Sequence, residues 1–266
     1  TEDTEDTEDS TEDTEDSTED TEDTEDSTED TEDSGNISRI VLNGNSITAD
    51  GYGVTVDGAN ATITAAGTYD ISGSLTDGQI IVDTEDEETV TLILNGADIG
   101  NSANAPVYVA NAEETVIVLA DGTENHISDS ASYVFEDPEA DEPNAALFSK
   151  DDLTISGSGS LTVDGNYNDG IASKDGLTIK GGTITVNSAD DGIRGKDCLI
   201  VEKGNITINA VGDGLKSDND ENAEKGYISV ESGVLNITSG GDAIQAATDV
   251  IITDGEIVIS SGGGSN

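Results

Sequence analysis

A short motif with an acidic first residue returns at a fixed interval in this 266-residue chain. Asp169-Gly170-Ile171 recurs 22 residues later as Asp191-Gly192-Ile193, and after another 22 residues as Asp213-Gly214-Leu215. Repeats of about 20–50 residues are typical of stacked architectures, in which each repeat buries its apolar face only against its neighbours. This repeat restricts the possible folds more than any other feature of the sequence.

Apolar residues occupy the same four positions of each repeat, and a further copy begins at Asp242. They come in pairs two residues apart, with mostly polar residues such as Thr between them, which is the alternation of a β-strand. The copy after Asp213 keeps the pattern once an insertion, 219–225, is allowed for. The columns are Leu177, Leu199, Ile228 and Val250; Ile179, Val201, Val230 and Ile252; Ile184, Ile206, Leu235 and Ile257; and Val186, Ile208, Ile237 and Ile259.

About 22 residues with three short strands predict one coil of a parallel β-helix, in which each coil pairs with the next. Five coils are visible between residues 145 and 261, and 52–142 should form three longer ones, giving about eight in an all-β fold. The segments 136–144 and 219–225 should loop out of the stack. A β-propeller, with blades of about 40 residues, fits less well. Either Gly262-Gly263-Gly264 closes the stack, or the natural chain continues.

Residues 1–35 consist almost entirely of Thr-Glu-Asp triplets. They contain 20 of the 59 acidic residues and nothing apolar, so they should form a disordered, extended tether. Two interpretations stay open: a solubilising tail, or a spacer that holds the domain away from a surface. Residues 36–266 are then the single folded domain, a β-helix that carries a formal net charge of −30.

This charge narrows the possible partners. Nucleic acid is not expected, because no basic surface is available to neutralise phosphates. No apolar run is long enough for a transmembrane segment, and the single cysteine, Cys198, excludes an intrachain disulfide framework. The chain starts without methionine and without a signal peptide, which suggests a mature chain whose export signal has been removed.

Stacking of the repeats should place aspartates in a column at one corner of the coil. Calcium binds six to eight oxygen atoms in adaptable geometry, so the column is a candidate metal site. The candidate ligands are Asn168, Asp169, Asp190, Asp191, Asp213 and Asp242. The alternative is that Asp-Gly is only turn chemistry, with the glycine at positive φ. The doubled Asp190-Asp191 favours calcium, since a turn does not need it.

Basic residues are few, and five of the nine fall on one strip beside the acidic column. Lys150 belongs to this strip, and the candidate substrate-binding residues are Lys174, Arg194, Lys196 and Lys216. The functional interpretation is a cationic stripe that faces an anionic polymer. The alternative is local pairing with Asp151, Asp175 and Asp197, which contributes little where the pairs are exposed.

The sequence offers little support for catalysis, and no catalytic residue is assigned. His126 is the only histidine and is expected in a surface loop. Arg194 or Lys216 beside the aspartate column would be the base of a calcium-assisted β-elimination. There is no tryptophan, and the six tyrosines share no repeat position, so no aromatic platform for a flat polysaccharide is expected.

The repeats at 168–186 and 190–208, with "GTYDISGSLTDGQIIVD" (67–83) and "VTLILNGADI" (90–99), resemble a known family. These are secreted bacterial carbohydrate-binding domain-containing proteins with a polysaccharide-lyase-like fold. The resemblance implies a right-handed single-stranded parallel β-helix, calcium between coils, and an exported protein, often a lipoprotein. It also implies binding of cellulose or acidic plant sugars such as polygalacturonate, without cleavage.

Together these features predict a monomeric, non-catalytic, calcium-stabilised protein at the bacterial cell surface. Its expected partner is an acidic cell-wall polysaccharide such as pectin. Because the domain is itself anionic, either calcium bridges the two polymers or the basic strip binds the glycan. The alternatives are a calcium-dependent polysaccharide lyase and a surface adhesin with no glycan ligand.

Overall fold

The computed structural model describes residues 37–262, except 136 and 138. Every regular element in this part of the chain is a β-strand, from β1 (Ser38–Gly44) to β25 (Glu256–Ser261). The described residues belong to one compact unit, Gly35–Asn266, and they contain no helix that could span a membrane. The predicted tether, 1–35, lies outside the described residues, so the division into tether and domain stays a prediction.

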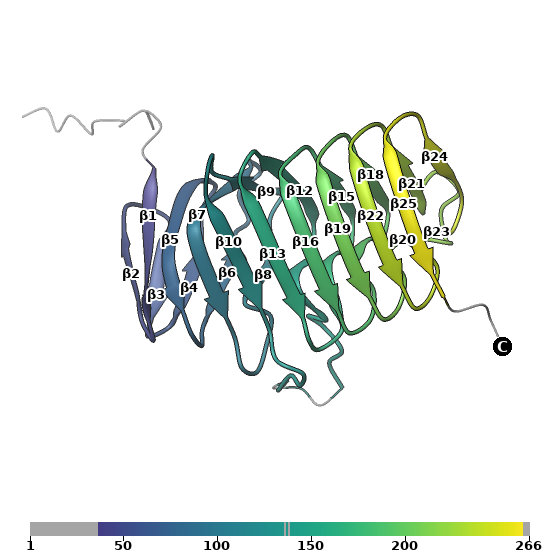
Figure 1. Cartoon of the computed structure of the whole chain (residues 1–266). Helices are drawn as coiled ribbons and strands as arrows, with labels where there is room; N and C mark the ends of the chain where they lie inside the picture. Colours follow the sequence, from purple (N-terminus) through teal and green to yellow (C-terminus); the bar gives the residue numbers. More distant parts are fainter. Residues whose placement is uncertain (1–36, 136, 138, 263–266) are drawn as a thin grey trace, which may run out of the picture. The chain divides into compact units, whose positions relative to one another are not determined.

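Most strands belong to three ladders of parallel strands (Figure 1). Ladder A comprises β9 (Glu114–Leu119), β12 (Asp152–Gly157), β15 (Gly176–Ile179), β18 (Cys198–Val201), β21 (Tyr227–Val230) and β24 (Val250–Ile252). Ladder B comprises β10 (Glu124–Ser128), β13 (Ser160–Gly165), β16 (Thr183–Ser188), β19 (Asn205–Ala210), β22 (Val234–Ser239) and β25. Ladder C comprises β6 (Gln79–Asp83), β8 (Val107–Asn111), β11 (Ala145–Ser149), β14 (Asp169–Ser173), β17 (Ile193–Gly195), β20 (Leu215–Ser217) and β23 (Ile244–Ala246). The long strand β7 (Val90–Gly100) pairs with both β9 and β10 and so joins ladders A and B.

The chain passes through ladders C, A and B in turn and then starts the next coil, as in a β-helix. The predicted columns are confirmed: Leu177 lies opposite Leu199, and Ile184 lies opposite Ile206. The insertion 219–225 leaves the pairing intact, because Leu199 lies directly opposite Ile228. Neither this insertion nor the described residues of 136–144 contain a strand. The sequence therefore predicted both the register and the positions of the two loops.

The N-terminal end differs from the expected long coils. β1 folds back on β2 (Ile47–Asp50), and β3 (Val54–Asp57) folds back on β4 (Asn60–Ile63), both in antiparallel hairpins. Only β1 and β4 continue the parallel stack, onto β5 (Gly67–Leu75) and β6 respectively. The prediction of a long coil from residue 52 is wrong here because Asp57-Gly58, with Gly58 at φ 62°, is a hairpin turn signal. The hairpins cover the first strand edges of the stack, which limits edge-to-edge aggregation.

Aliphatic side chains fill the interior of the stack. Leu177, Leu199 and Ile228 are 0% exposed, whereas Val250 in the last described coil is 47% exposed because no described strand covers it. Thr115 is a buried polar residue in one of these aliphatic columns. It is fully buried between Val90 and Leu153, and its hydroxyl has no hydrogen-bond partner among the described residues.

Replacing Thr115 with valine should stabilise the fold. The change keeps the shape of the side chain and removes an unsatisfied buried hydroxyl, which typically costs about 1–3 kcal/mol. Thermal melting should therefore rise by several degrees, at about 2–4 °C per kcal/mol for a domain of this size. Thr154→Val is the matched control, because the Thr154 hydroxyl donates to Glu114 Oε1 at 3.0 Å. Removing this hydroxyl should not raise the melting temperature. An unchanged or lower melting temperature for Thr115→Val would contradict the assignment.

Candidate functional site

The aspartate column lies at the corner where the chain leaves ladder B and enters ladder C. The backbone stacks here in register: Gly170 N donates to Asp191 O at 3.0 Å, and Gly192 N donates to Asp213 O at 2.8 Å. The glycines are needed for space rather than for a positive φ, because a Cβ on Gly192 would lie 2.6 Å from Gly214 O. The interpretation of Asp-Gly as turn chemistry therefore explains why glycine is needed here. It is wrong about the backbone, because Gly170, Gly192 and Gly214 do not have a positive φ.

The aspartate side chains form a second ladder beside the backbone. Asp169 Oδ1 accepts a hydrogen bond from Asp191 N at 3.1 Å. Asp191 Oδ1 accepts one from Asp213 N at 2.8 Å, and Asp213 Oδ1 accepts one from Asp242 N at 2.8 Å. Each carboxylate thus uses one oxygen to bind the next coil and directs the other to its surroundings. Part of the acidic column is explained by this structural role.

Three carboxylates converge at one end of the column. Asp169, Asp190 and Asp191 each offer an oxygen atom within 4.8 Å of the other two. Asp169 is 1% exposed and Asp191 is 5% exposed, whereas Asp190 lies at the surface. Burial, with the neighbouring charge of Asp191, raises the pKa of Asp169 to about 7. Asn168 adjoins this group, and its backbone carbonyl accepts a hydrogen bond from Asp190 N. Such a cluster of hard oxygen atoms suits a divalent cation.

The part of the coil formed by Asn168, Asp169, Asp190, Asp191, Asp213 and Asp242 is called the acidic corner. Two basic residues of the predicted strip lie within it. Lys216 Nζ lies 2.8 Å from Asp191 Oδ2 and 3.1 Å from Asp213 Oδ2. Arg194 forms a two-pronged pair with Asp218, and its Nη1 lies 4.0 Å from Asp169 Oδ2. Burial alone would lower the pKa of Lys216, but its bonds to both aspartates outweigh this and raise it. The two cations therefore offset part of the negative charge of the column.

The other two candidate substrate-binding residues, Lys174 and Lys196, form no ion pair with the column. Lys174 pairs with Glu142 of the inserted segment and not with Asp175, the partner that local pairing suggested. Lys196 has no ion pair in the part of the chain that the structure describes. The structure thus brings two of the four predicted substrate-binding residues to the candidate metal site, and their binding role stays a prediction.

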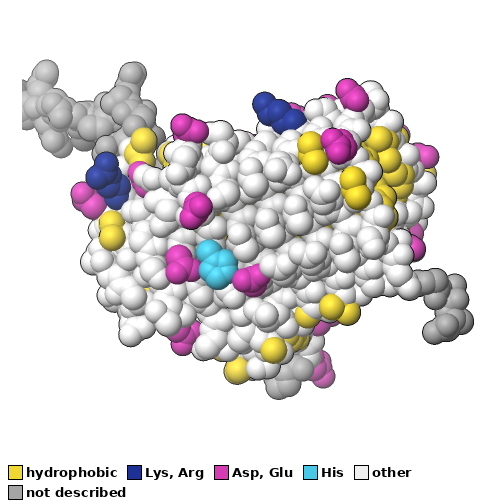
Figure 2. Space-filling view, viewed as in Figure 1, with side chains coloured by type: hydrophobic (Ala, Val, Ile, Leu, Met, Phe, Trp, Pro, Cys, Tyr) yellow, Lys and Arg dark blue, Asp and Glu magenta, His cyan; other side chains and the backbone are white. Residues whose placement is uncertain are grey.

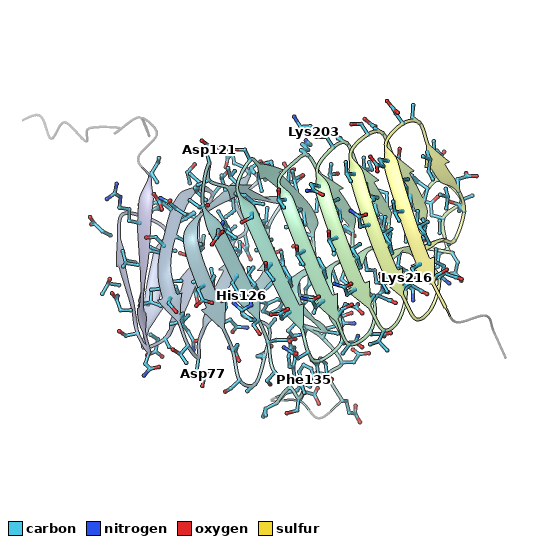
Figure 3. The ribbon with its side chains drawn as sticks, in the orientation of Figure 1. Asp77, Asp121, His126, Phe135, Lys203 and Lys216 are labelled. Atoms are coloured by element: carbon cyan, nitrogen blue, oxygen red, sulfur yellow. The ribbon has the colours of Figure 1, made fainter. Side chains whose placement is uncertain are left out.

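An aromatic cluster, which the sequence did not reveal, lies beside this corner. The rings of Tyr133 and Tyr167 stack with centroids 4.1 Å apart, and Phe135 packs against both; Figure 3 labels Phe135 in the projecting segment. The Tyr133 hydroxyl donates to Asp129 Oδ2 at 2.6 Å. These residues come from unrelated repeat positions, so periodicity could not group them. The insertion before residue 145 was the only available signal.

His126 lies in strand β10, so the expectation of a surface-loop histidine is wrong. Its Nδ1 lies 3.0 Å from Asp98 Oδ1 and its Nε2 lies 2.9 Å from Asp164 Oδ2. The histidine sits between two acids on the outer face of ladder B (Figures 2 and 3). Desolvation alone would lower the pKa of His126, but the hydrogen bonds to Asp164 and Asp98 outweigh it and raise the pKa.

The comparisons with known proteins agree with this architecture. A family model for carbohydrate-binding domain-containing proteins matches residues 57–266. A protein of Acetivibrio thermocellus with the same description is 46% identical over 125 residues, which are 47% of this chain and 44% of that protein. The chain therefore matches less than half the length of this relative. A solved structure, described as a gadolinium derivative of the polysaccharide lyase-like protein from C. thermocellum, superposes with a TM-score of 0.76 and 38% identity. The superposition covers 85% of this chain and 95% of that one.

Removing the charge of Lys216 should destabilise the acidic corner. Lys216→Gln leaves Asp191 and Asp213 with no ammonium group between them, and loss of one partner from a buried ion pair costs about 3 kcal/mol. Urea unfolding in metal-free buffer measures the change in the free energy of unfolding. The control is Lys203→Gln, which removes an exposed lysine and should change stability little. Equal effects of the two substitutions would show that Lys216 has no special role.

The pair of acids around His126 should make stability depend on pH. Because the folded state raises the pKa of His126, the stabilisation is fully present below the unfolded pKa of about 6.5 and is lost as the pH rises through the higher folded pKa. His126→Gln keeps a polar side chain without the titration. The difference in melting temperature between the two proteins should shrink as the pH rises past about 6.5; a constant difference would refute this.

Proposed function

Because this chain belongs to the carbohydrate-binding domain-containing protein family, we propose that it binds plant cell-wall polysaccharide without cleaving it. In this proposal calcium binds at the acidic corner and links it to acidic sugars such as polygalacturonate. The observation that carries the proposal is the convergence of Asp169, Asp190 and Asp191, two of them buried, within 4.8 Å. The wider ligand set is Asn168, Asp213 and Asp242.

The proposed ion would reduce the repulsion between the acids of the corner. Two buried carboxylates side by side repel each other strongly in a medium of low polarity. The raised pKa of Asp169 reflects first its burial and then this repulsion. A divalent cation would neutralise the group. The description of a similar protein as a gadolinium derivative supports the idea, because gadolinium, like calcium, is a hard cation that prefers oxygen ligands.

Calcium also accounts for an acidic protein that binds an acidic polymer. The folded domain and a polyuronate are both anions, so direct contact would be repulsive. An ion held partly by exposed Asp190 can complete its coordination with a sugar carboxylate. Lys174 and Lys196 lie outside the acidic column and are the candidate direct contacts to the polymer. Arg194 and Lys216 are the other two. Like Lys174, both are already paired with acids.

The geometry favours binding over β-elimination, the alternative function. A lyase would need a neutral base beside the metal, and the candidates are Arg194 and Lys216. The pKa of each is raised above its ordinary value, despite burial, by adjacent carboxylates. Both are already held in ion pairs with acids, so neither is a free base in this arrangement. From the repeat and the family resemblance we also propose that the protein is a monomeric, right-handed β-helix of about eight coils. In this proposal it is exported to the bacterial surface as a lipoprotein.

Removal of calcium should weaken both stability and binding. With EDTA, the melting temperature should fall and retention on immobilised polygalacturonate should be lost, and added calcium should restore both. Asp190→Asn should reduce calcium-dependent binding with little effect on folding, because Asp190 is exposed. The matched control is Asp220→Asn, an exposed acid outside the cluster. Insensitivity of both properties to EDTA would exclude the calcium site.

Two further readouts separate the alternatives. Incubation with polygalacturonate and calcium should produce no ultraviolet absorbance from unsaturated sugar, and a steady increase would identify a lyase. A glycan array with and without calcium should give signals for cell-wall polysaccharides. A blank array under both conditions would favour an adhesin that binds no glycan.

A further inference from the structure

A row of hydrogen-bonded side chains crosses the outer side of ladder B, and His126 joins its two halves (Figures 2 and 3). The Nδ1 atom of His126 lies 3.0 Å from Asp98 Oδ1 on β7, and its Nε2 atom lies 2.9 Å from Asp164 Oδ2 on β13. The row continues over β16 and β19, where Asn187 Nδ2 donates to Asp164 Oδ1 at 2.7 Å and Asn209 Nδ2 donates to Asn187 Oδ1 at 2.9 Å. Side chains of successive coils are therefore connected through one imidazole ring.

The two contacts of the ring depend on its protonation state. An ionised carboxylate only accepts hydrogen bonds, so each ring nitrogen that faces one must carry a hydrogen atom. An imidazolium has two N–H groups, whereas a neutral imidazole has one. Both contacts of His126 are hydrogen bonds at the same time only while the ring is protonated.

The charged groups that face the ring are few. Asp98 is the only charged residue of β7, and Asp164 is the only one of β13. Strand β11, which also packs against β10, has none. On β10 itself Glu124 is exposed, and it forms no hydrogen bond or ion pair with the ring among the described residues. When the ring loses a proton, either Asp98 or Asp164 therefore loses its donor.

The two acids differ in how well they tolerate that loss. The side chain of Asp164 is 35% exposed and is also held by Asn187, whose amide is fixed in turn by Asn209. The side chain of Asp98 is 58% exposed, and its other partner is the hydroxyl of Ser74, which donates to Asp98 Oδ2 at 3.1 Å. A carboxylate that faces the lone pair of a nitrogen must turn toward water, and this costs less for the more exposed acid. The remaining proton should therefore stay on Nε2.

We infer that His126 is a pH-controlled link between coils, which joins Asp98 to Asp164 when protonated and keeps only Asp164 when neutral. The contact with Asp98 lies at the first of the three residue pairs that join β7 to β10, so deprotonation loosens this junction and leaves a free carboxylate on the outer side of ladder B. The link does not depend on the calcium or the glycan proposed above, because none of its residues belongs to the proposed ligand set.

The tautomer of the neutral ring tests the link directly. Because His126 is the only histidine, NMR of the ring nitrogens in isotope-labelled protein without a histidine tag reports on it alone. A pH titration should show an imidazolium at low pH and the Nε2–H tautomer once the ring is neutral. Asp164→Asn should move the neutral ring toward the Nδ1–H tautomer, since Asp98 is then the only carboxylate in contact. Glu124→Gln is the matched control and should leave the tautomer unchanged.

Melting temperatures of the same proteins test the release of Asp98. Asp98→Asn should lower the melting temperature while His126 is protonated. Above the pKa of His126 this loss should vanish or reverse, because Asp98 is already free in the wild type and an asparagine amide can donate to Nδ1. Asp164→Asn should lower the melting temperature in both pH ranges. These results together with the tautomer shift support the inference. A mainly Nδ1–H ring in the wild type, an unchanged tautomer in Asp164→Asn, or an equal loss for Asp98→Asn at both pH values overturns it.

Discussion

Hydrogen bonds between each coil and the next, in constant register from β11 onward, determine the other properties of this structure. Parallel pairing places equivalent residues of successive repeats side by side, so a property of one position becomes a property of a whole column. Aliphatic columns such as Leu177–Leu199–Ile228 fill the interior. The same pairing also places polar side chains in columns on the outside, even where like charges then repel each other. At Thr115 the pairing leaves one hydroxyl group in an aliphatic column without a hydrogen-bond partner among the described residues.

Stacking places like charges close together, and several groups at the acidic corner offset the repulsion between its carboxylates. Backbone N–H groups of the next coil bind one oxygen of Asp169, Asp191 and Asp213. The ammonium group of Lys216 lies between the second and third of these acids. Between the first and second, the nearest cation is the guanidinium of Arg194, 4.0 Å from Asp169. Asp169 is therefore the less compensated of the two buried acids, and it lies where the additional acid Asp190 joins the column, so the proposed ion would stabilise that end most.

The spacing of the repeat predicted the elements that stay in register and missed those that interrupt the register. The columns, both inserted loops and the stacking of Asp169 on Asp191 follow from spacing alone. The N-terminal hairpins break the parallel pattern, and the Asp57-Gly58 signal for one of them was overshadowed by the repeat. His126 looked isolated because its partners, Asp98 and Asp164, lie 28 and 38 residues away in neighbouring coils. The Tyr133–Tyr167 stack depends on an insertion whose path no repeat specifies.

The same register explains how one small domain can present surfaces of opposite character. Each ladder repeats its own outward residues, so a change confined to one position of the repeat alters one whole side and leaves the others unchanged. Acids at one corner form the proposed calcium site, while threonine and asparagine face outward on ladder B. The acidic column and the polar columns of ladder B are different positions of one repeat, so a substitution repeated in one column can change its side of the coil without changing the other.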